Sequence, residues 1–258
     1  EGSGRAGGGA GAAWLGELRG LLLRHPQAVV GEIGLDRSPK WRPGYAAQRA
    51  AFRAQLRLAA ELGRPVTLHC VKAFGDAVED LEACLVGPGG PGRLPPGVYF
   101  HSYSGSVETA RRLLALPGAA FFFGFSLAAN GRSPKTPATI AALPEGSLLL
   151  ESDGEGRADL GARLRGSLAL VARVRGWGAA RAAATTAANA RAFFAGGGGG
   201  GGGGARSAAL APRSPAQRGT EGAREGAAQE AHAEFAPRGE NGCPPPWPER
   251  SEDGDGCA

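Results

Sequence analysis

Sulfur-containing residues are scarce in this 258-residue chain, which has four Cys and no Met. Cys70 and Cys84 lie in the middle of the chain, and Cys243 and Cys257 lie near its end. None of them has the close pairing of a zinc ribbon, and four cysteines in a chain of this length do not form a disulfide framework. The composition therefore excludes a small disulfide-stabilised domain and a cysteine-based zinc fold.

Long apolar runs are also absent. No stretch reaches the roughly 18 apolar residues of a membrane span, and no charged segment followed by an apolar core near the start resembles a signal peptide. We therefore expect no membrane association. The expected location is the cytoplasm, with the nucleus as a second compartment.

Two regions have too few large apolar side chains to form a core. Residues 1–12 are rich in Gly, and nine consecutive glycines at 196–204 lead into a tail whose only large apolar residues are Leu210, Phe235 and Trp247. Such segments cannot offset the entropy lost when a chain becomes ordered. We predict a disordered start at 1–12, one folded domain at 13–195, and a poly-Gly linker with a disordered tail at 196–258.

Acidic residues are outnumbered, and the formal net charge is +5. The tail after Gly204 has six Arg against nine acidic residues, so the basic excess lies in the rest of the chain. A basic domain is compatible with a polyanionic substrate. Because 26 of the 29 basic residues are Arg, beside abundant Ala and Gly, coding bias explains the charge equally well.

Short apolar runs alternate with helical patterns through the folded domain. The runs predict strands at 28–32, 66–69, 98–101, 119–123 and 147–150, and the 3.6-residue patterns predict helices at 14–24, 45–62, 73–85, 107–116, 136–143, 159–175 and 179–194. This alternation is typical of a parallel sheet or an α/β barrel. The run 121–125 predicts sheet core rather than a base-stacking platform.

Four polar side chains each stand at the carboxyl end of a different predicted strand: Glu32, His69, His101 and Asp153. Catalytic residues of α/β barrels gather at that end, and imidazole and carboxylate groups suit divalent metals. A buried carboxylate such as the one predicted for Glu32 needs a partner or a cation. Each residue alone is more often structural, as a hydrogen-bonded His or a helix cap. Their shared placement favours a metal site.

Five blocks resemble TatD-type metal-dependent deoxyribonucleases. They are GEIGLD at 31–36, RPVTLHCVKA at 64–73, HSYSG at 101–105, LLLESD at 148–153 and NARAFF at 189–194. The second and third blocks are most similar to the eukaryotic, Cut9-interacting Scn1-like branch of that family. The resemblance covers about residues 13–195 and keeps the order of the blocks.

The resemblance implies a TIM-type (β/α) barrel of the amidohydrolase superfamily with two divalent ions, Mg, Mn or Zn. By that resemblance Glu32 bridges the ions, His69 and His101 hold the second ion, and Asp153 holds the first and helps to activate water. Glu32 and Asp153 are thus the implied catalytic residues. The implied reaction is phosphodiester hydrolysis, for which paired ions are well suited, and the implied substrate is DNA, as single strands or ends.

Other polar residues near these strand ends have either a functional or a structural role. Glu151 either orients Asp153 or a His ligand, or pairs with a nearby Arg. Lys72 either contacts a substrate phosphate or is simply solvated. Ser102 and Ser104 offer hydroxyl groups, with helix N-capping the favoured role. No role is assigned to 36–37, the last residue of the first block and the Arg after it.

The chain also departs from the family pattern. Family members begin with a strand carrying a His-X-His pair, and this chain has no such pair. The first two barrel strands are therefore expected to be missing, and the first metal position would keep only Glu32 and Asp153. A truncated gene model or a fragment of an active enzyme is one interpretation.

Two alternatives to this enzyme remain open at this point. One is a catalytically inactive relative that works as a scaffold, with a protein partner bound through the tail or through exposed barrel edges. The other is a different hydrolase of the superfamily that acts on a carbonyl or a lactone.

Overall fold

In the computed structural model the described residues are 9–86, 92–154 and 159–196, with side chains described from Ala13 onward. Helices and strands alternate along them: α1 Gly9–Arg24, β1 Val30–Asp36, α2 Tyr45–Glu61, β2 Val66–Val71, α3 Phe74–Leu85, β3 Gly97–Phe100, α4 Val107–Leu114, β4 Ala120–Phe125, α5 Leu127–Asn130, α6 Thr136–Ala142, β5 Leu148–Leu150, α7 Leu160–Arg175 and α8 Ala179–Ala195. Short 3-10 turns precede α2, at Arg42–Gly44, and β5, at Glu145–Ser147.

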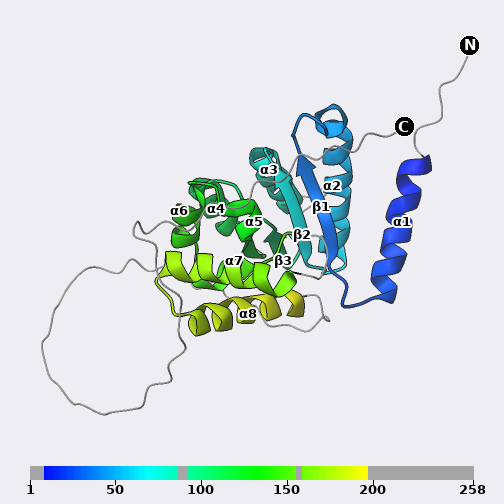
Figure 1. Cartoon of the computed structure of the whole chain (residues 1–258). Coiled ribbons are helices and arrows are strands. Elements are labelled where there is room, and N and C mark those ends of the chain that lie inside the picture. Colours follow the sequence, from blue (N-terminus) through cyan, green and yellow to red (C-terminus); the bar gives the residue numbers. More distant parts are fainter. Residues whose placement is uncertain (1–8, 87–91, 155–158, 197–258) are drawn as a thin grey trace, which may run out of the picture. The chain divides into compact units, whose positions relative to one another are not determined.

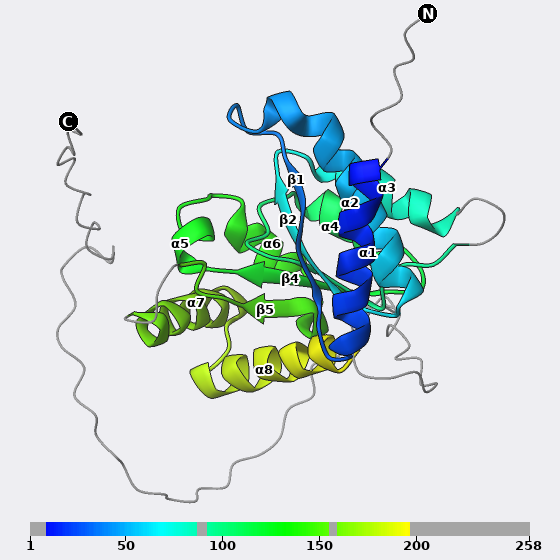
Figure 2. The same cartoon turned by 90° about the vertical axis from the view of Figure 1, so that its right-hand side faces the viewer.

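The five strands form one parallel sheet in the order β1-β2-β3-β4-β5, of which Figure 1 labels β1, β2 and β3 and Figure 2 labels β4 and β5. Helix α2 packs against β1, helix α8 packs against β5, and α7 lies beside α8 (Figure 2). A complete TIM barrel has eight strands. Within the described residues β1 and β5 are therefore edge strands of an open sheet. The predicted α/β class and the parallel sheet are confirmed.

The core lies between the sheet and its helices and is built from the predicted apolar runs. Phe122 of β4 is buried on one face of the strand, and Phe123 and Phe125 are fully buried on the other face in the main apolar cluster, as a strand covered on both faces requires. Phe52 and Leu56 of α2 pack into the same cluster. The run 121–125 is thus sheet core, as predicted.

Strand β1 differs from its prediction. It continues through the whole GEIGLD block to Asp36, so Glu32 is its third residue rather than its last. The glycines do not end the strand, because they allow it to approach β2 closely. A Cβ atom on Gly34 would lie 1.8 Å from the carbonyl oxygen of His69. The prediction that Glu32 ends a strand is therefore wrong.

An extra residue interrupts the pairing of β1 with β2. Val30 pairs with Val66 and Ile33 with Leu68, so β1 advances further than β2 between the two pairs. Such a β-bulge re-aims the side chains beside it and is frequent next to active sites. The bulge falls at Gly31 and Glu32.

Other boundaries differ by a few residues. Helix α1 begins at Gly9, inside the segment predicted to be disordered, and the short helix α5 has no counterpart among the predicted elements. Residues 1–8 and 197–258 lie outside the described part of the chain, so predicted disorder there stays a prediction. No helix in the described ranges is long and apolar enough to cross a membrane.

Candidate metal centre

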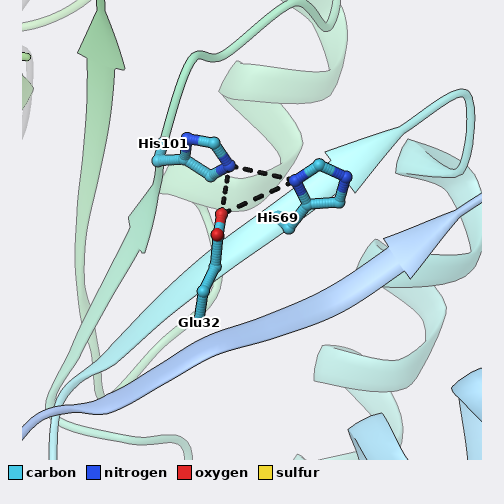
Figure 3. Close-up of side chains that lie close together, drawn as sticks. All are labelled: Glu32, His69 and His101. Carbon is cyan, nitrogen blue, oxygen red and sulfur yellow. Dashed lines mark hydrogen bonds and ion pairs between the residues drawn. The ribbon is translucent and has the colours of Figure 1, made fainter. Parts of the chain in front are cut away.

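Three predicted ligands converge at one point (Figure 3). One carboxylate oxygen of Glu32, Oε1, lies 3.5 Å from Nδ1 of His69 and is in direct contact with Nε2 of His101. The two imidazole nitrogens lie 3.1 Å apart. One donor atom from each residue lies within 4.8 Å of the other two. The structure therefore brings together three of the four predicted ligands.

Adjacent parallel strands position the three side chains. His69 is within β2, and His101 directly follows β3. Glu32 reaches them from the bulge in β1. Its side chain is 46% exposed, so the prediction of a buried carboxylate is wrong. The exposure follows from the position of β1 at the edge of the described sheet, where no described strand covers it.

The donor set fits a divalent cation. Each neutral imidazole has one N–H and one nitrogen with a free lone pair, so both facing nitrogens present lone pairs when each ring carries its proton on the other nitrogen. Together with an anionic oxygen, these nitrogens match the ligand types of zinc and of other transition metals. A cation between them would satisfy atoms that otherwise crowd one another.

Asp36 is a contributor that the sequence prediction missed. Its Oδ2 lies 3.6 Å from Nε2 of His69, on the side of the ring that faces away from Glu32. Partial burial favours the neutral acid, but hydrogen bonding from Ser38 and the nearby His69 outweigh it, so the pKa of Asp36 is lowered. An ionised Asp36 favours a proton on Nε2 and leaves Nδ1 free to bind a metal.

Asp153 lies outside this three-residue cluster and is connected to it through Ser102. The Ser102 hydroxyl is 2.9 Å from Oδ2 of Asp153 and 2.5 Å from Oε1 of Glu151. Because a hydroxyl has one proton to donate, it bonds one of the two carboxylates at a time. Ser102 directly follows His101, so this contact joins Asp153 to the segment that carries one of the three clustered residues.

Glu151 anchors this side of the site. Besides the Ser102 hydroxyl, it accepts a hydrogen bond from the Ser102 amide at 2.5 Å and one from the Tyr99 hydroxyl. Burial, and then the charge of Glu151, raise the pKa of Tyr99, so its phenol stays protonated and can donate. Tyr99 is two residues before His101, a spacing that places both side chains on the same face of a strand. This spacing is the sequence signal that could have identified Tyr99 as a residue near the site.

The N-capping role favoured for Ser102 and Ser104 is wrong. Helix α4 is capped by Ser106, whose side-chain oxygen accepts from the Thr109 amide at 3.1 Å. Ser104 lies two residues before this cap, and its side chain forms no hydrogen bond within the described part of the chain. The Ser102 hydroxyl instead lies within hydrogen-bond distance of Glu151 and Asp153 and can donate to either of them.

Three non-glycine residues have positive φ among the residues described: Lys72 at 54°, Ser102 at 41° and Asp153 at 43°. All three follow carboxyl ends of strands. This left-handed conformation is uncommon for side-chain-bearing residues and is often found at functional sites. The unusual backbone thus coincides with the predicted site residues.

A parallel α/β sheet with histidines and carboxylates gathered toward the carboxyl ends of its strands defines a class of protein. It is the arrangement of barrel-type hydrolases that bind metal ions.

The chain belongs to the TatD-related DNase family, whose family model matches residues 10–195. It is 27% identical over 206 residues to the Cut9-interacting protein scn1 of Schizosaccharomyces pombe, covering 64% of this chain and 61% of that protein. It is 36% identical over 135 residues to the 3'-5' ssDNA/RNA exonuclease TatD of Edwardsiella piscicida, covering 51% and 48%. The chain thus spans about half to three fifths of the length of these relatives.

A solved structure supports the fold. The TatD homologue YJJV of Escherichia coli K12 superposes with a TM-score of 0.58 at 28% identity, covering 71% of each chain. The predicted TIM-type architecture and the resemblance to TatD proteins are thereby confirmed. Family membership and the donor cluster of Glu32, His69 and His101 together indicate that the chain uses a divalent metal.

Proposed function

We propose that this chain carries the hydrolytic centre of a metal-dependent nuclease that cleaves phosphodiester bonds in single-stranded nucleic acid. The observation that carries the proposal is the convergence of donor atoms from Glu32, His69 and His101. Two further facts support it: the family is described as related to DNases, and one relative is named as an ssDNA/RNA exonuclease. DNA, as single strands or ends, is the proposed substrate.

The proposed roles are metal binding and proton acceptance. Glu32, His69 and His101 would hold a divalent ion, Mg, Mn or Zn, and Glu32 and Asp153 would share a second, more weakly held one. Such ions activate water and offset the charge of the phosphoryl oxygens. Asp153 is the proposed acceptor of the proton from the attacking water, and the Ser102 hydroxyl holds its carboxylate in place.

The non-catalytic scaffold remains the alternative from another class. The clustered ligands and the nuclease relatives disfavour it, because a scaffold has no need of three metal donors at one point. A protein partner at the edge of β1 or through residues 197–258 stays a prediction. So does a cytoplasmic or nuclear location.

The proposal predicts cleavage that depends on a divalent metal. End-labelled single-stranded DNA and RNA of one sequence would be incubated with the chain and Mg²⁺, Mn²⁺ or Zn²⁺, with EDTA as the metal-free control. We expect shortened products only with metal. A parallel fusion that supplies a His-X-His strand upstream of Trp14 tests whether a weak first site limits the rate. If neither protein cleaves either strand with any metal, the proposed function is wrong.

A second prediction concerns Glu151, which we propose as a positioning residue. In Glu151→Gln one carboxylate oxygen becomes an NH₂ group that cannot accept from the Ser102 amide or from Tyr99, so Ser102 and Asp153 lose their fixed positions. We expect kcat to fall about 10- to 100-fold with little change in KM. The matched control is Glu145→Gln, whose carboxylate pairs with Arg181 on the surface. Equal effects of both variants, or a purely thermal destabilisation, would contradict the positioning role.

A further inference from the structure

A basic cavity of about 540 Å³ lies beyond the carboxyl ends of β1 and β2. Its lining consists of Arg37, Pro39, Arg42, Pro43 and Lys72. Three of these five residues are cationic and none is acidic. The cavity is separate from the cluster of Glu32, His69 and His101, none of which lines it.

The pairing of β1 with β2 places two of the cations together. Asp36 pairs with Val71 at the ends of the strands, and the amide of Arg37 donates to the carbonyl of Val71 at 2.9 Å. Arg37 and Lys72 therefore leave adjacent strand ends side by side. The 3-10 turn at Arg42–Gly44 brings the third cation back toward them.

The local interactions hold Arg37 in place and leave the cavity positive. Its guanidinium lies 2.8 Å from Oδ2 of Asp76 and 4.7 Å from the ring centroid of Tyr45. Asp76 pairs with Arg37 and also with Arg49, at 3.1 Å, so the positive charge of the cavity comes from Arg42 and Lys72. In the described part of the chain, neither Arg42 nor Lys72 forms an ion pair, and both side chains are exposed.

The cavity is close to the metal centre along the same strands. Lys72 comes three residues after the ligand His69, a separation on the order of 10 Å at about 3.3 Å per residue. Arg37 directly follows Asp36, whose carboxylate is 3.6 Å from His69. A polyanion held at the metal centre that continues past the carboxyl ends of β1 and β2 would therefore reach this cavity.

We propose that this cavity binds a backbone phosphate of the nucleic acid strand, next to the phosphodiester bond that the metal centre cleaves. The inference rests on the proposed function, because it names the contact that holds the rest of the substrate. Arginine and lysine are the usual phosphate donors. Contacts of this kind fix the position of a strand without reading its bases, so binding here is independent of sequence.

The test measures binding without catalysis. A labelled single-stranded oligonucleotide would be titrated with the chain in EDTA, by fluorescence anisotropy, at several salt concentrations. In the double variant Lys72→Gln and Arg42→Gln, we expect Kd to rise about tenfold or more, as for the loss of charge-assisted contacts. The slope of log K against log salt should shrink by about 0.7 for each lost phosphate contact.

Two controls make the result specific. Lys40→Gln removes a cation of the same loop that lies over Trp41 and does not line the cavity, and it should leave Kd and slope near wild type. An oligonucleotide with uncharged methylphosphonate linkages should bind the wild type and the double variant equally weakly. Circular dichroism would verify that all variants are folded.

The outcomes separate this inference from the proposed function. If metal-dependent cleavage occurs but the double variant binds phosphodiester DNA like Lys40→Gln, the cavity is not a phosphate site. If cleavage is never observed but the double variant alone loses affinity and salt dependence, the phosphate site stands and the proposed function falls.

Discussion

Glu32→Gln is expected to lower the rate of divalent-dependent cleavage by more than about 100-fold. Loss of a residue that only supports a metal ligand costs up to about 100-fold, and loss of a ligand itself should cost more. Glu32 is the one anion of the converging cluster, and its Oε1 faces both imidazoles. The glutamine has nearly the same size but no charge, so it cannot offset a divalent cation. The initial rate with saturating metal and single-stranded DNA is the measurement.

The matched control for this variant is Glu17→Gln, an exposed carboxylate on α1. It should keep wild-type activity. A calorimetric titration with Mn²⁺ should show weaker metal binding for Glu32→Gln and unchanged binding for Glu17→Gln. If Glu32→Gln retained activity within a few-fold of wild type, Glu32 would not be a metal ligand of the catalytic site.

Asp80→Ala is expected to destabilise the fold by about 3 kcal/mol, near the lower end of the cost of breaking a buried ion pair. Asp80 on α3 is 0% exposed. Its carboxylate accepts from Nε of Arg49 at 2.9 Å and from Nε of Arg53 at 2.6 Å, both on α2. Removing it leaves two facing guanidinium groups without their shared anion. The lower end applies because both arginines are partly exposed.

The neighbouring carboxylate provides the control for this second variant. Glu79 also pairs with Arg49, at 2.8 Å, but its side chain is 59% exposed. Glu79→Ala should therefore cost less than about 1 kcal/mol, as is typical of surface ion pairs. The free energies of unfolding would be measured by urea denaturation. Similar losses for the two variants would show that burial of Asp80 does not set the cost.

The order of strands and helices was predictable because it depends on local patterns. Apolar runs bounded by glycine and proline marked β2 and β4, and a 3.6-residue period marked α2. Boundaries were less accurate where a local signal had two meanings. Glycines in 31–36 suggested a bend, whereas Gly34 allows β1 to lie against His69.

Part of the site was also predictable. His69 and His101 follow or lie within short apolar runs, and such runs in an α/β pattern place them toward one end of the sheet. The roles of Asp36, Tyr99 and Ser102 could not be predicted, since each depends on a partner on another strand or loop. Asp36 acts on His69 of the next strand. Ser102 and Tyr99 bond Glu151, which is about fifty positions away.

The sequence by itself determined the kind of protein: a parallel α/β fold, a family, and the histidine and carboxylate groups that can bind a divalent metal. Only the tertiary structure decided which of those groups meet. The bulge in β1 turns Glu32 toward His69 and His101, and the open edge of β1 leaves its carboxylate exposed. Asp153 stays outside the cluster, within hydrogen-bond distance of Ser102, the residue after His101. Donor chemistry belongs to single residues, but their distances depend on strand register and loop conformation, which arise from contacts distant in sequence.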